Sequence, residues 1–509
     1  MSEKKKIQKK TTQKRVTKVT PVKKSKKVEK EFKPRFSWLL VLFVPLLAFE
    51  AAMGISLLTK VQKLNLLQTW QYLLIVVVMA AIFAFSAYKI IFSRKTGKVL
   101  KMFLLVLTFL LGALYCYGSH YASHVITFVE GMTGEHVQTE TYSVYVIKNG
   151  GYKQLKNLQR QSVGYVSTNP NRAETEARLQ NAVEHKAVDF ENVGEIATAL
   201  FDAKVGAIVL NNSYLDVLAE TNLDFENRTT VLYSFEVRID SPDEPITVDI
   251  KTEPFIMYIS GTDSRSGLNA VARSDVNMLA VVNPKARKIL LVSIPRDYYV
   301  QLHGTTGTKD KLTHAGIYGV NMSKTTIEDL FGIEINYTTK VSFSTVISVV
   351  DTLGGIEIDS DQEFTAYTNK SCHIQQGKQI LNSACALAYS RERYAYTSGD
   401  RHRIQNQQDV TIAILNKLSD PHYLAKYPNI LENAEGSFET TMSYDEITNF
   451  AKHQLSTLQG WEVERISVDG YGASLPTYSM GAQNLYVMIP DQATVDAAKA
   501  KIDEVMTAE

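Results

Sequence analysis

Hydrophobic residues are distributed unevenly along the 509-residue chain. Three strongly apolar stretches stand near the N-terminus, at residues 36–58, 70–92 and 99–117. Each is close to the roughly 20 residues that a helix needs to cross a bilayer, so we predict three transmembrane helices within residues 37–119. Glu50 lies inside the first stretch. Such an acid is either functional or sits near the outer end of its helix and reaches the interface.

Beyond residue 120 the pattern alternates between short apolar strands and amphipathic helices. In residues 120–243 we predict strands at 142–147, 163–167, 205–210 and 229–239, and helices at 173–186, 194–204 and 213–219. This alternation predicts a small α/β domain. The Pro- and acid-rich segment 240–245 marks its end. It carries no motif for chemistry, so we interpret it as a binding or spacer module.

Residues 246–509 are predicted to form a larger α/β domain with an α–β–α arrangement. A strand at 254–260 is followed by a hairpin, whose strands at 276–282 and 288–293 are joined by an Asn-Pro turn. Helices are predicted at 322–330, 344–353, 406–418 and 493–506, with a short one opened by the cap-type residues Asn382 and Ser383. The pair Gly354-Gly355 ends the second of these helices.

Charge separates the N-terminal tail from the rest. Residues 1–36 hold 15 Lys/Arg and 3 acids, whereas the remainder has an excess of 10 acids. The tail lacks hydrophobic periodicity and is predicted to be disordered. It is either a nucleic-acid-binding segment or a topology signal, and the adjacent spans favour the second. Its basic residues place the N-terminus in the cytoplasm and the two later domains outside the cell.

Three cysteines are present. Cys116 lies in the third apolar stretch, while Cys372 and Cys385 are thirteen residues apart in the larger domain. An oxidising exterior permits a disulfide between them, but the sequence leaves open whether their geometry does. No His/Cys spacing indicates zinc.

Arginines and acids cluster where the predicted strands of the larger domain end. Arginine matches phosphate oxygens two at a time, and acids among arginines suggest a hard cation bound to the same phosphates. We interpret the set as a pyrophosphate site with Mg²⁺ as cofactor. The proposed magnesium ligands are Asp263 and Asp275; the pyrophosphate-binding residues are Arg273, Arg296, Lys311, Arg391, Arg393, Arg403 and Gln407.

The alternative is a collection of ordinary surface ion pairs, such as Asp275 with Arg273. This explanation is adequate for any single residue. It is weaker for all the arginines and acids together, because they recur where strongly apolar strands end. Arg273, Arg296, Asp297 and Asp400 are the candidates for direct participation in catalysis. Asp297 and Asp400 would act as a base or orient a neighbouring arginine. His314 is a further candidate base, or a solvated or supporting histidine.

Five short motifs of the larger domain, taken in their order along the chain, resemble those of the LytR–CpsA–Psr family. The motifs are R-S-D from Arg273, P-R-D from Pro295, K-L-T-H-A from Lys311, R-E-R from Arg391 and G-D-R-H-R from Gly399. The resemblance is strong over residues 246–420, and the three-span anchor with its extra module resembles streptococcal capsule-type members. Gln405 stands where an arginine can occur in relatives, which puts a role there in doubt.

The resemblance implies a mixed central sheet and a membrane enzyme that attaches anionic glycopolymers, here most simply capsular polysaccharide, to peptidoglycan. The polymer would come from a polyprenyl-pyrophosphate carrier on the outer face of the membrane. It also implies that Asp400 orients the arginines and that an apolar pocket holds the polyprenyl tail; residues 341–350 would form a wall of that pocket or plain core.

The expected reaction is attack by a peptidoglycan hydroxyl, with a polyprenyl phosphate or pyrophosphate leaving. Three rival interpretations remain: a metal-dependent pyrophosphatase, a membrane-anchored regulator whose tail contacts DNA, and a polymer-binding scaffold without catalysis. The sequence does not predict the oligomeric state.

Overall fold

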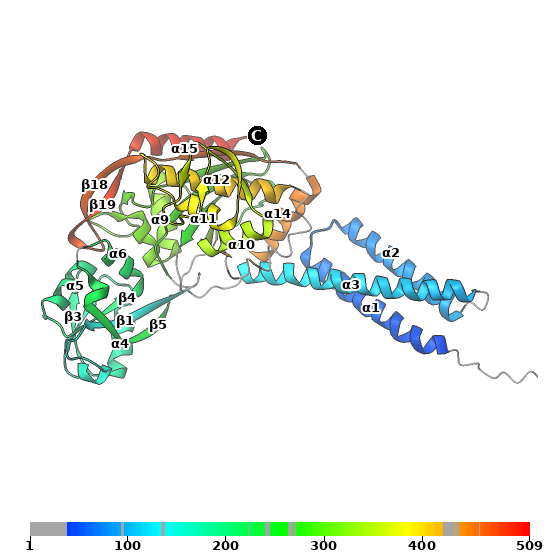
Figure 1. The fold of residues 1–509 in the computed structure, drawn as a ribbon, viewed down its shortest axis with the longest axis horizontal. Helices are drawn as coiled ribbons and strands as arrows, with labels where there is room; N and C mark the ends of the chain where they lie inside the picture. Colours follow the sequence, from blue (N-terminus) through cyan, green and yellow to red (C-terminus); the bar gives the residue numbers. More distant parts are fainter. Residues whose placement is uncertain are drawn as a thin grey trace, which may run out of the picture.

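The structure is a computed structural model. It describes residues 38–92, 96–133, 138–221, 223–239, 245–262, 268, 271–420, 433, 436, 438–457 and 459–509. The predicted basic tail, residues 1–36, lies outside the described residues, as does nearly all of the predicted boundary at 240–245. Figure 1 shows three parts: a helical anchor, a small α/β module and a larger α/β domain that joins the other two.

The anchor consists of three helices long and apolar enough to cross a membrane. Two of them extend further than predicted, because their last turns pack on each other and on the larger domain. Leu64, Ala122 and Ile126 form one apolar cluster at this end, and the Phe128 ring lies 6.3 Å from the Phe438 ring. The helices are α1 (Trp38–Leu64), α2 (Thr69–Ala87, continued by a π-helical turn at Tyr88–Phe92) and α3 (Lys98–Thr133).

Glu50 does not lie at the outer end of its helix. Because α1 continues to Leu64, Glu50 stands near its middle, and its side chain is 1% exposed. Gly112 of α3 approaches it so closely that a Cβ there would lie 3.5 Å from the Glu50 Cα. The expectation that Glu50 reaches the interface is therefore wrong for this structure.

The small module is a five-stranded mixed sheet with order β3-β2-β4-β1-β5. The predicted helix at 173–186 is too long: α4 ends at Ala182, and the next residues form β3, which pairs in parallel with β2. Val188 and Phe190 explain the strand, because they pack on the core of the module. Its elements are β1 (Gln138–Ile147), β2 (Ser162–Val166), α4 (Arg172–Ala182), β3 (Lys186–Phe190), α5 (Val193–Phe201), β4 (Ala207–Asn211), α6 (Leu215–Ala219), α7 (Phe225–Arg228) and β5 (Thr229–Ile239).

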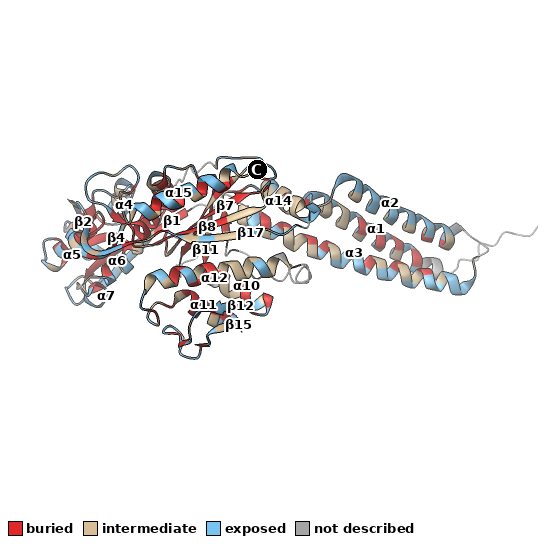
Figure 2. Cartoon of the chain, turned by 90° about the horizontal axis from the view of Figure 1, so that it is seen from above, coloured by how far each residue is buried: buried red, intermediate tan, exposed pale blue. Residues whose placement is uncertain are grey.

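The larger domain has helices on both faces of a six-stranded mixed sheet, as predicted, with order β16-β11-β6-β7-β8-β17 (Figure 2). The first elements include the predicted hairpin. They are β6 (Phe255–Thr262), β7 (Val276–Asn283), β8 (Lys288–Ile294), β9 (Tyr299–Val300), β10 (Asp310–Lys311), α8 (Leu312–Ala315), α9 (Val320–Phe331), β11 (Tyr337–Ser342) and α10 (Phe343–Leu353).

The remaining elements complete the sheet, a disulfide-linked subregion and a terminal hairpin. They are β12 (Ile356–Ser360), β13 (Phe364–Thr365), β14 (His373–Ile374), β15 (Gly377–Leu381), α11 (Ser383–Arg391), α12 (Asp400–Ser419), β16 (Phe438–Thr440), α14 (Tyr444–Thr457), β17 (Glu462–Ser467), β18 (Gly470–Thr477), β19 (Gly481–Pro490) and α15 (Gln492–Thr507).

Side chains that alternate along the central strands pack against helices on the two opposite faces of the sheet. In β7, Leu279 and Val281 pack with α9 and α15, whereas Met278 and Ala280 pack in the cluster that includes Ile412 of α12. Successive side chains of a strand point to opposite faces, so an almost continuous apolar run predicts a sheet covered on both sides. The sheet therefore fixes where its charged ends stand.

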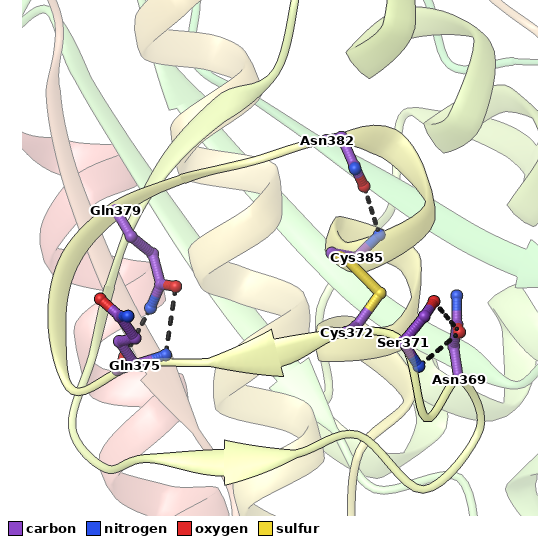
Figure 3. The surroundings of a disulfide bond; sticks show 7 residues. All are labelled: Asn369, Ser371, Cys372, Gln375, Gln379, Asn382 and Cys385. Atoms are coloured by element: carbon purple, nitrogen blue, oxygen red, sulfur yellow. Dashed lines mark hydrogen bonds between the residues drawn. A yellow bond between two sulfur atoms is a disulfide. The ribbon is translucent and has the colours of Figure 1, made fainter.

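A disulfide joins Cys372 to Cys385, with the Cα atoms 5.3 Å apart (Figure 3). This settles the open question on their geometry. Asn382 caps α11, its side chain accepting a hydrogen bond of 2.9 Å from the Cys385 N–H. The bond thus holds the start of α11, which ends at Arg391, to the β13–β14 hairpin. Val349 and Val350 of α10 pack in the same core, which favours the core explanation for residues 341–350.

Candidate functional site

Three central strands end or begin at the same edge of the sheet, and they position the first charged residues. The antiparallel register pairs Gly261 with Val276 and Asn277 with Ile294. Asp275 directly precedes β7, and its N–H donates to the Gly261 carbonyl at 2.8 Å. Residues that follow β6, precede β7 or follow β8 therefore lie close together at this edge of the sheet. Thr262 and Arg296, for example, are 34 positions apart in the sequence.

Asp275, Arg296, Asp297 and Lys311 form a row of alternating charge at this edge. Arg296 Nη1 lies 2.9 Å from Asp275 Oδ1, and Arg296 Nε lies 3.6 Å from Asp297 Oδ2. The other oxygen of Asp297 is 3.2 Å from Lys311 Nζ. The Lys311 side chain is only 3% exposed, so the row is largely withdrawn from solvent. Ion pairs in such a setting are screened little by salt.

The row continues into the small module through Glu220, which follows α6. Lys311 Nζ lies 2.6 Å from Glu220 Oε2, and Arg273 Nη1 lies 2.8 Å from Glu220 Oε1. Arg273 also stands 3.5 Å from Asp216 Oδ2, one turn earlier on α6. One carboxylate from the small module thus bridges two cations of the larger domain.

Helix α12 supplies the last ion pair of the cluster. It begins at Asp400, six residues before the predicted start, and Arg403 Nη2 lies 2.6 Å from Asp400 Oδ1. Burial lowers the pKa of Arg403; Asp400 opposes this, and the nearby Arg296 lowers it further. Arg403 therefore belongs electrostatically to the same cluster. The positive φ of Gly399, 56°, lets the chain turn into the helix at this point.

The electrostatics of Arg296 and Asp297 fix their ionised forms. Burial would lower the pKa of Arg296, but the carboxylates of Asp275 and Asp297 outweigh it and raise the pKa. Burial would likewise raise the pKa of Asp297, but Arg296 and Lys311 outweigh it and hold the pKa below its ordinary value. An acid that is ionised and already paired with two cations is a weak base at neutral pH. Its geometry suits orientation of Arg296 and Lys311.

Four of the predicted site residues have no contact with this cluster among those that the structure describes. Asp263 lies outside the described residues. Arg391 is the last residue of α11. The guanidinium of Arg393 lies 4.7 Å from the ring centre of its neighbour Tyr394 and donates to its hydroxyl. Gln407 is half-buried on α12, and its backbone carbonyl accepts from Thr411.

His314 is not a solvated histidine. Its side chain is fully buried, with Nδ1 2.6 Å from Asp310 Oδ1 and 3.0 Å from Ser479 Oγ. The same aspartate accepts the Ser479 N–H at 2.9 Å. This arrangement ties β10 and α8 to the turn of the β18–β19 hairpin. A ring without solvent contact cannot reach a substrate hydroxyl, which favours a supporting role over a base.

The cations with described contacts in this cluster are all paired with carboxylates. Arg273, Arg296, Lys311 and Arg403 face five carboxylates: Asp216, Glu220, Asp275, Asp297 and Asp400. Among the described residues, no group of three or more His, Cys, Asp or Glu side chains could hold a metal ion. Mg²⁺ commonly uses only one or two carboxylates together with substrate phosphates. Asp275 with Asp263 meets that requirement in residue type.

Comparison with known proteins gives the family. The model of the LytR_cpsA_psr family matches residues 226–504. The chain belongs to the LytR–CpsA–Psr family. Its relatives include polyisoprenyl-teichoic acid–peptidoglycan teichoic acid transferase TagU of Bacillus mycoides (strain KBAB4), 32% identical over 247 residues, which are 48% of this chain and 77% of that protein.

Two further proteins are similar to part of the chain. TagU of Bacillus subtilis (strain 168) is 33% identical over 204 residues, covering 40% of this chain and 64% of TagU. The crystal structure of TagV from B. subtilis is 27% identical and has a TM-score of 0.43, covering 50% of this chain and 98% of TagV.

Sequence reasoning missed Glu220 and Asp216. Both precede residue 226, where the LytR–CpsA–Psr match begins, and both lie in a module without a recognisable motif. Their only sequence signal is a spacing of four residues, which places two acids on one side of a helix turn. That spacing is too common to mark a site.

Proposed function

We propose that this chain transfers an anionic glycopolymer from a polyprenyl-pyrophosphate carrier to peptidoglycan. The observation that carries the proposal is the row of ion pairs from Asp275 through Arg296 and Lys311 to Arg273, at the end of the central sheet. The transferase names of the TagU relatives support the same reaction class. Capsular polysaccharide is the proposed polymer, from the resemblance of the anchor and small module to capsule-type members.

The proposed location is the outer face of the cell membrane. The three apolar helices contact the larger domain through α3, where Phe128 packs on Phe438, and this would keep a lipid-linked substrate and the site at one surface. The 15 Lys/Arg residues of the first 36 positions favour a cytoplasmic N-terminus, and an odd number of spans then puts both later domains outside. The disulfide between Cys372 and Cys385 suits that oxidising side.

In the proposed reaction, the cations bind the diphosphate and neutralise charge that develops on the departing polyprenyl phosphate. A peptidoglycan hydroxyl forms the new O–P bond, the bridging P–O bond breaks, and the hydroxyl proton leaves to solvent. Arg296 and Arg403 are oriented for this role by Asp275 and Asp400. Lys311 and Arg273 become available when the diphosphate takes the place of Glu220.

Mg²⁺ is proposed to be held by Asp263 and Asp275, where it would supply positive charge to the diphosphate oxygens. The described ion pairs support this. Among the contacts that the structure describes, Arg273, Arg296, Lys311 and Arg403 are already paired with carboxylates, so Mg²⁺ would add positive charge that these cations do not have to spare.

The test uses the full-length protein in nanodiscs, a synthetic polyprenyl-pyrophosphate glycan, peptidoglycan fragments and Mg²⁺, with the joined product detected by mass spectrometry. Arg296→Ala and Asp275→Asn should abolish the product. Arg178→Ala is the matched control, because Arg178 forms an exposed pair with Glu174 on α4, within the small module.

Each outcome points to one interpretation. A joined product that only the control retains supports the transferase and its site. Release of free glycan phosphate without a joined product, unaffected by the acceptor, would make the protein a pyrophosphatase. Bound lipid without turnover in any sample would leave a scaffold or regulator as the better description.

A further inference from the structure

A cavity of about 650 Å³ lies where the anchor meets the larger domain. One wall is the first turn of α2, with Trp70 and Leu73. The opposite wall is one face of α14, with Lys452 and His453. Lys251, in the segment before β6, also lines the cavity. The candidate site described above includes none of these residues.

Direct contacts fix the two walls relative to each other. Lys452 Nζ donates to Asn65 Oδ1 at 3.1 Å, in the connection between α1 and α2. Tyr444, at the start of α14, donates its hydroxyl to the Lys63 carbonyl at 3.4 Å. Both views place α14 beside this connection (Figure 1, Figure 2). Because α2 begins at Thr69 as an apolar span, the cavity stands at the level of lipid headgroups.

The polar side of the cavity is suited to a phosphate. The amines of Lys251 and Lys452 are strong donors that bind phosphate as point charges. Asn449 and Ser456 flank Lys452 on the same face of α14 and add neutral donors. The nearest described carboxylate partner is Asp249, whose Oδ1 is 3.9 Å from Lys251 Nζ. That pair is exposed and stands at the limit of ion-pair distance, so the Lys251 amine keeps donors for an anion in the cavity.

The other side of the cavity leads onto an apolar stripe. Trp70, Leu73 and Val77 stand at i, i+3 and i+7 of α2, and their exposed fractions are 61%, 55% and 63%. These positions share one face of a helix. Tryptophan is typical of the interface between lipid and water. The two sides together are suited to a ligand with a phosphate at one end and a hydrocarbon chain at the other.

We propose that this cavity binds the phosphate headgroup of a membrane lipid, specifically an acidic glycerophospholipid, with an acyl chain along the stripe on α2. The bound lipid would join α14 to the anchor and fix the height of the larger domain above the bilayer. A polyprenyl phosphate offers the same phosphate chemistry and is the competing source. The proposal does not depend on the transferase site, since it rests on the junction alone.

The test is lipid retention by the full-length protein, released from nanodiscs of phosphatidylcholine, phosphatidylglycerol and a polyprenyl phosphate into native mass spectrometry. We expect one retained phosphatidylglycerol per chain. Lys251→Gln combined with Lys452→Gln should lower its retention by about 30-fold, the effect of two lysines near an anionic lipid. Asn449→Asp, nearly isosteric, should do the same by adding a carboxylate. Lys204→Gln, in the small module, is the control.

Retention that both variants leave unchanged would overturn the proposal. If the variants lose only the polyprenyl phosphate adduct, the site belongs to the carrier, and the phospholipid assignment is wrong. Loss of phosphatidylglycerol from both variants but not from the control supports it. Asn449→Asp keeps both lysines, so a shared result does not depend on the removal of a lysine side chain.

Discussion

Replacing Glu220 by glutamine should strengthen the binding of a pyrophosphate ligand. In the free protein the two oxygens of Glu220 contact Lys311 and Arg273 at 2.6 and 2.8 Å. A carboxylate that bridges two cations occupies the place that a phosphate needs. Binding under our proposal is therefore an exchange of one anion for another, and Glu220→Gln removes the charge of the competitor while preserving its shape.

The size of the effect follows from the exposure of the three side chains. A hydrogen bond to a charged partner contributes about 1.5–3 kcal/mol, whereas exposed ion pairs contribute about 1 kcal/mol or less. Glu220 is 30% exposed, Arg273 15% and Lys311 3%, so this pair of contacts falls between those limits. An exchange cost lowered by about 1–2 kcal/mol gives a Kd lower by about 5- to 30-fold.

The assay is isothermal titration of the full-length protein in detergent micelles with geranylgeranyl pyrophosphate and Mg²⁺. Asp216→Asn should produce a smaller gain, because that carboxylate is 72% exposed and 3.5 Å from Arg273. Glu174→Gln, which affects only an exposed pair with Arg178, should leave the Kd unchanged. An equal or higher Kd for Glu220→Gln would refute the exchange and show that Glu220 holds the two cations ready for the ligand.

Three further results are expected. Cys372→Ala with Cys385→Ala should lower the free energy of unfolding by about 3 kcal/mol, for a loop closed over thirteen residues; an unchanged Tm in thermal unfolding would contradict this. Asp297 has a pKa below its ordinary value because Arg296 and Lys311 outweigh the effect of burial, so the stability it supplies is present above about pH 4 and is lost as pH falls through the folded pKa. The Tm of the parent should therefore drop more between pH 6 and pH 3 than that of Asp297→Asn, and parallel curves would argue against it. Chelation of Mg²⁺ should slow transfer by about 100-fold or more, since a bound metal supplies several kcal/mol of transition-state stabilisation; full activity in excess chelator would exclude the proposed cofactor.

Elements with a strong local signal were predictable from the sequence. The hairpin of β7 and β8 follows from two apolar runs joined by Asn283-Pro284. The end of α10 follows from Gly354, whose φ of 75° is open to glycine at little cost. The fold class, with three apolar helices and a mixed sheet covered on both faces, is confirmed for the same reason: these features repeat over many residues.

Elements whose residues lack that signal were placed wrongly or not predicted at all. The first turn of α12 is polar because Asp400 and Arg403 belong to the charged cluster and Arg401 pairs with Asp469, so hydrophobic periodicity begins only later in the helix. The strands β18 and β19 pair over eight residues on each side, yet their outward residues include the exposed Tyr471 and Tyr486. Such strands are defined by their partner, and a single sequence does not reveal the partner.

The position of Glu220 is the part of the site that depends most on tertiary structure. Contacts between the small module and the larger domain hold it in place. Tyr214, next to α6, donates its hydroxyl to that of Tyr318 at 2.8 Å. Met480 and Leu485, from the β18–β19 hairpin, pack into the core of the small module with Ile317. A shared apolar core cannot slide freely, because interiors are close-packed. The small module is therefore docked with its acids against Arg273 and Lys311, and a diphosphate must displace the carboxylate locally rather than move the module.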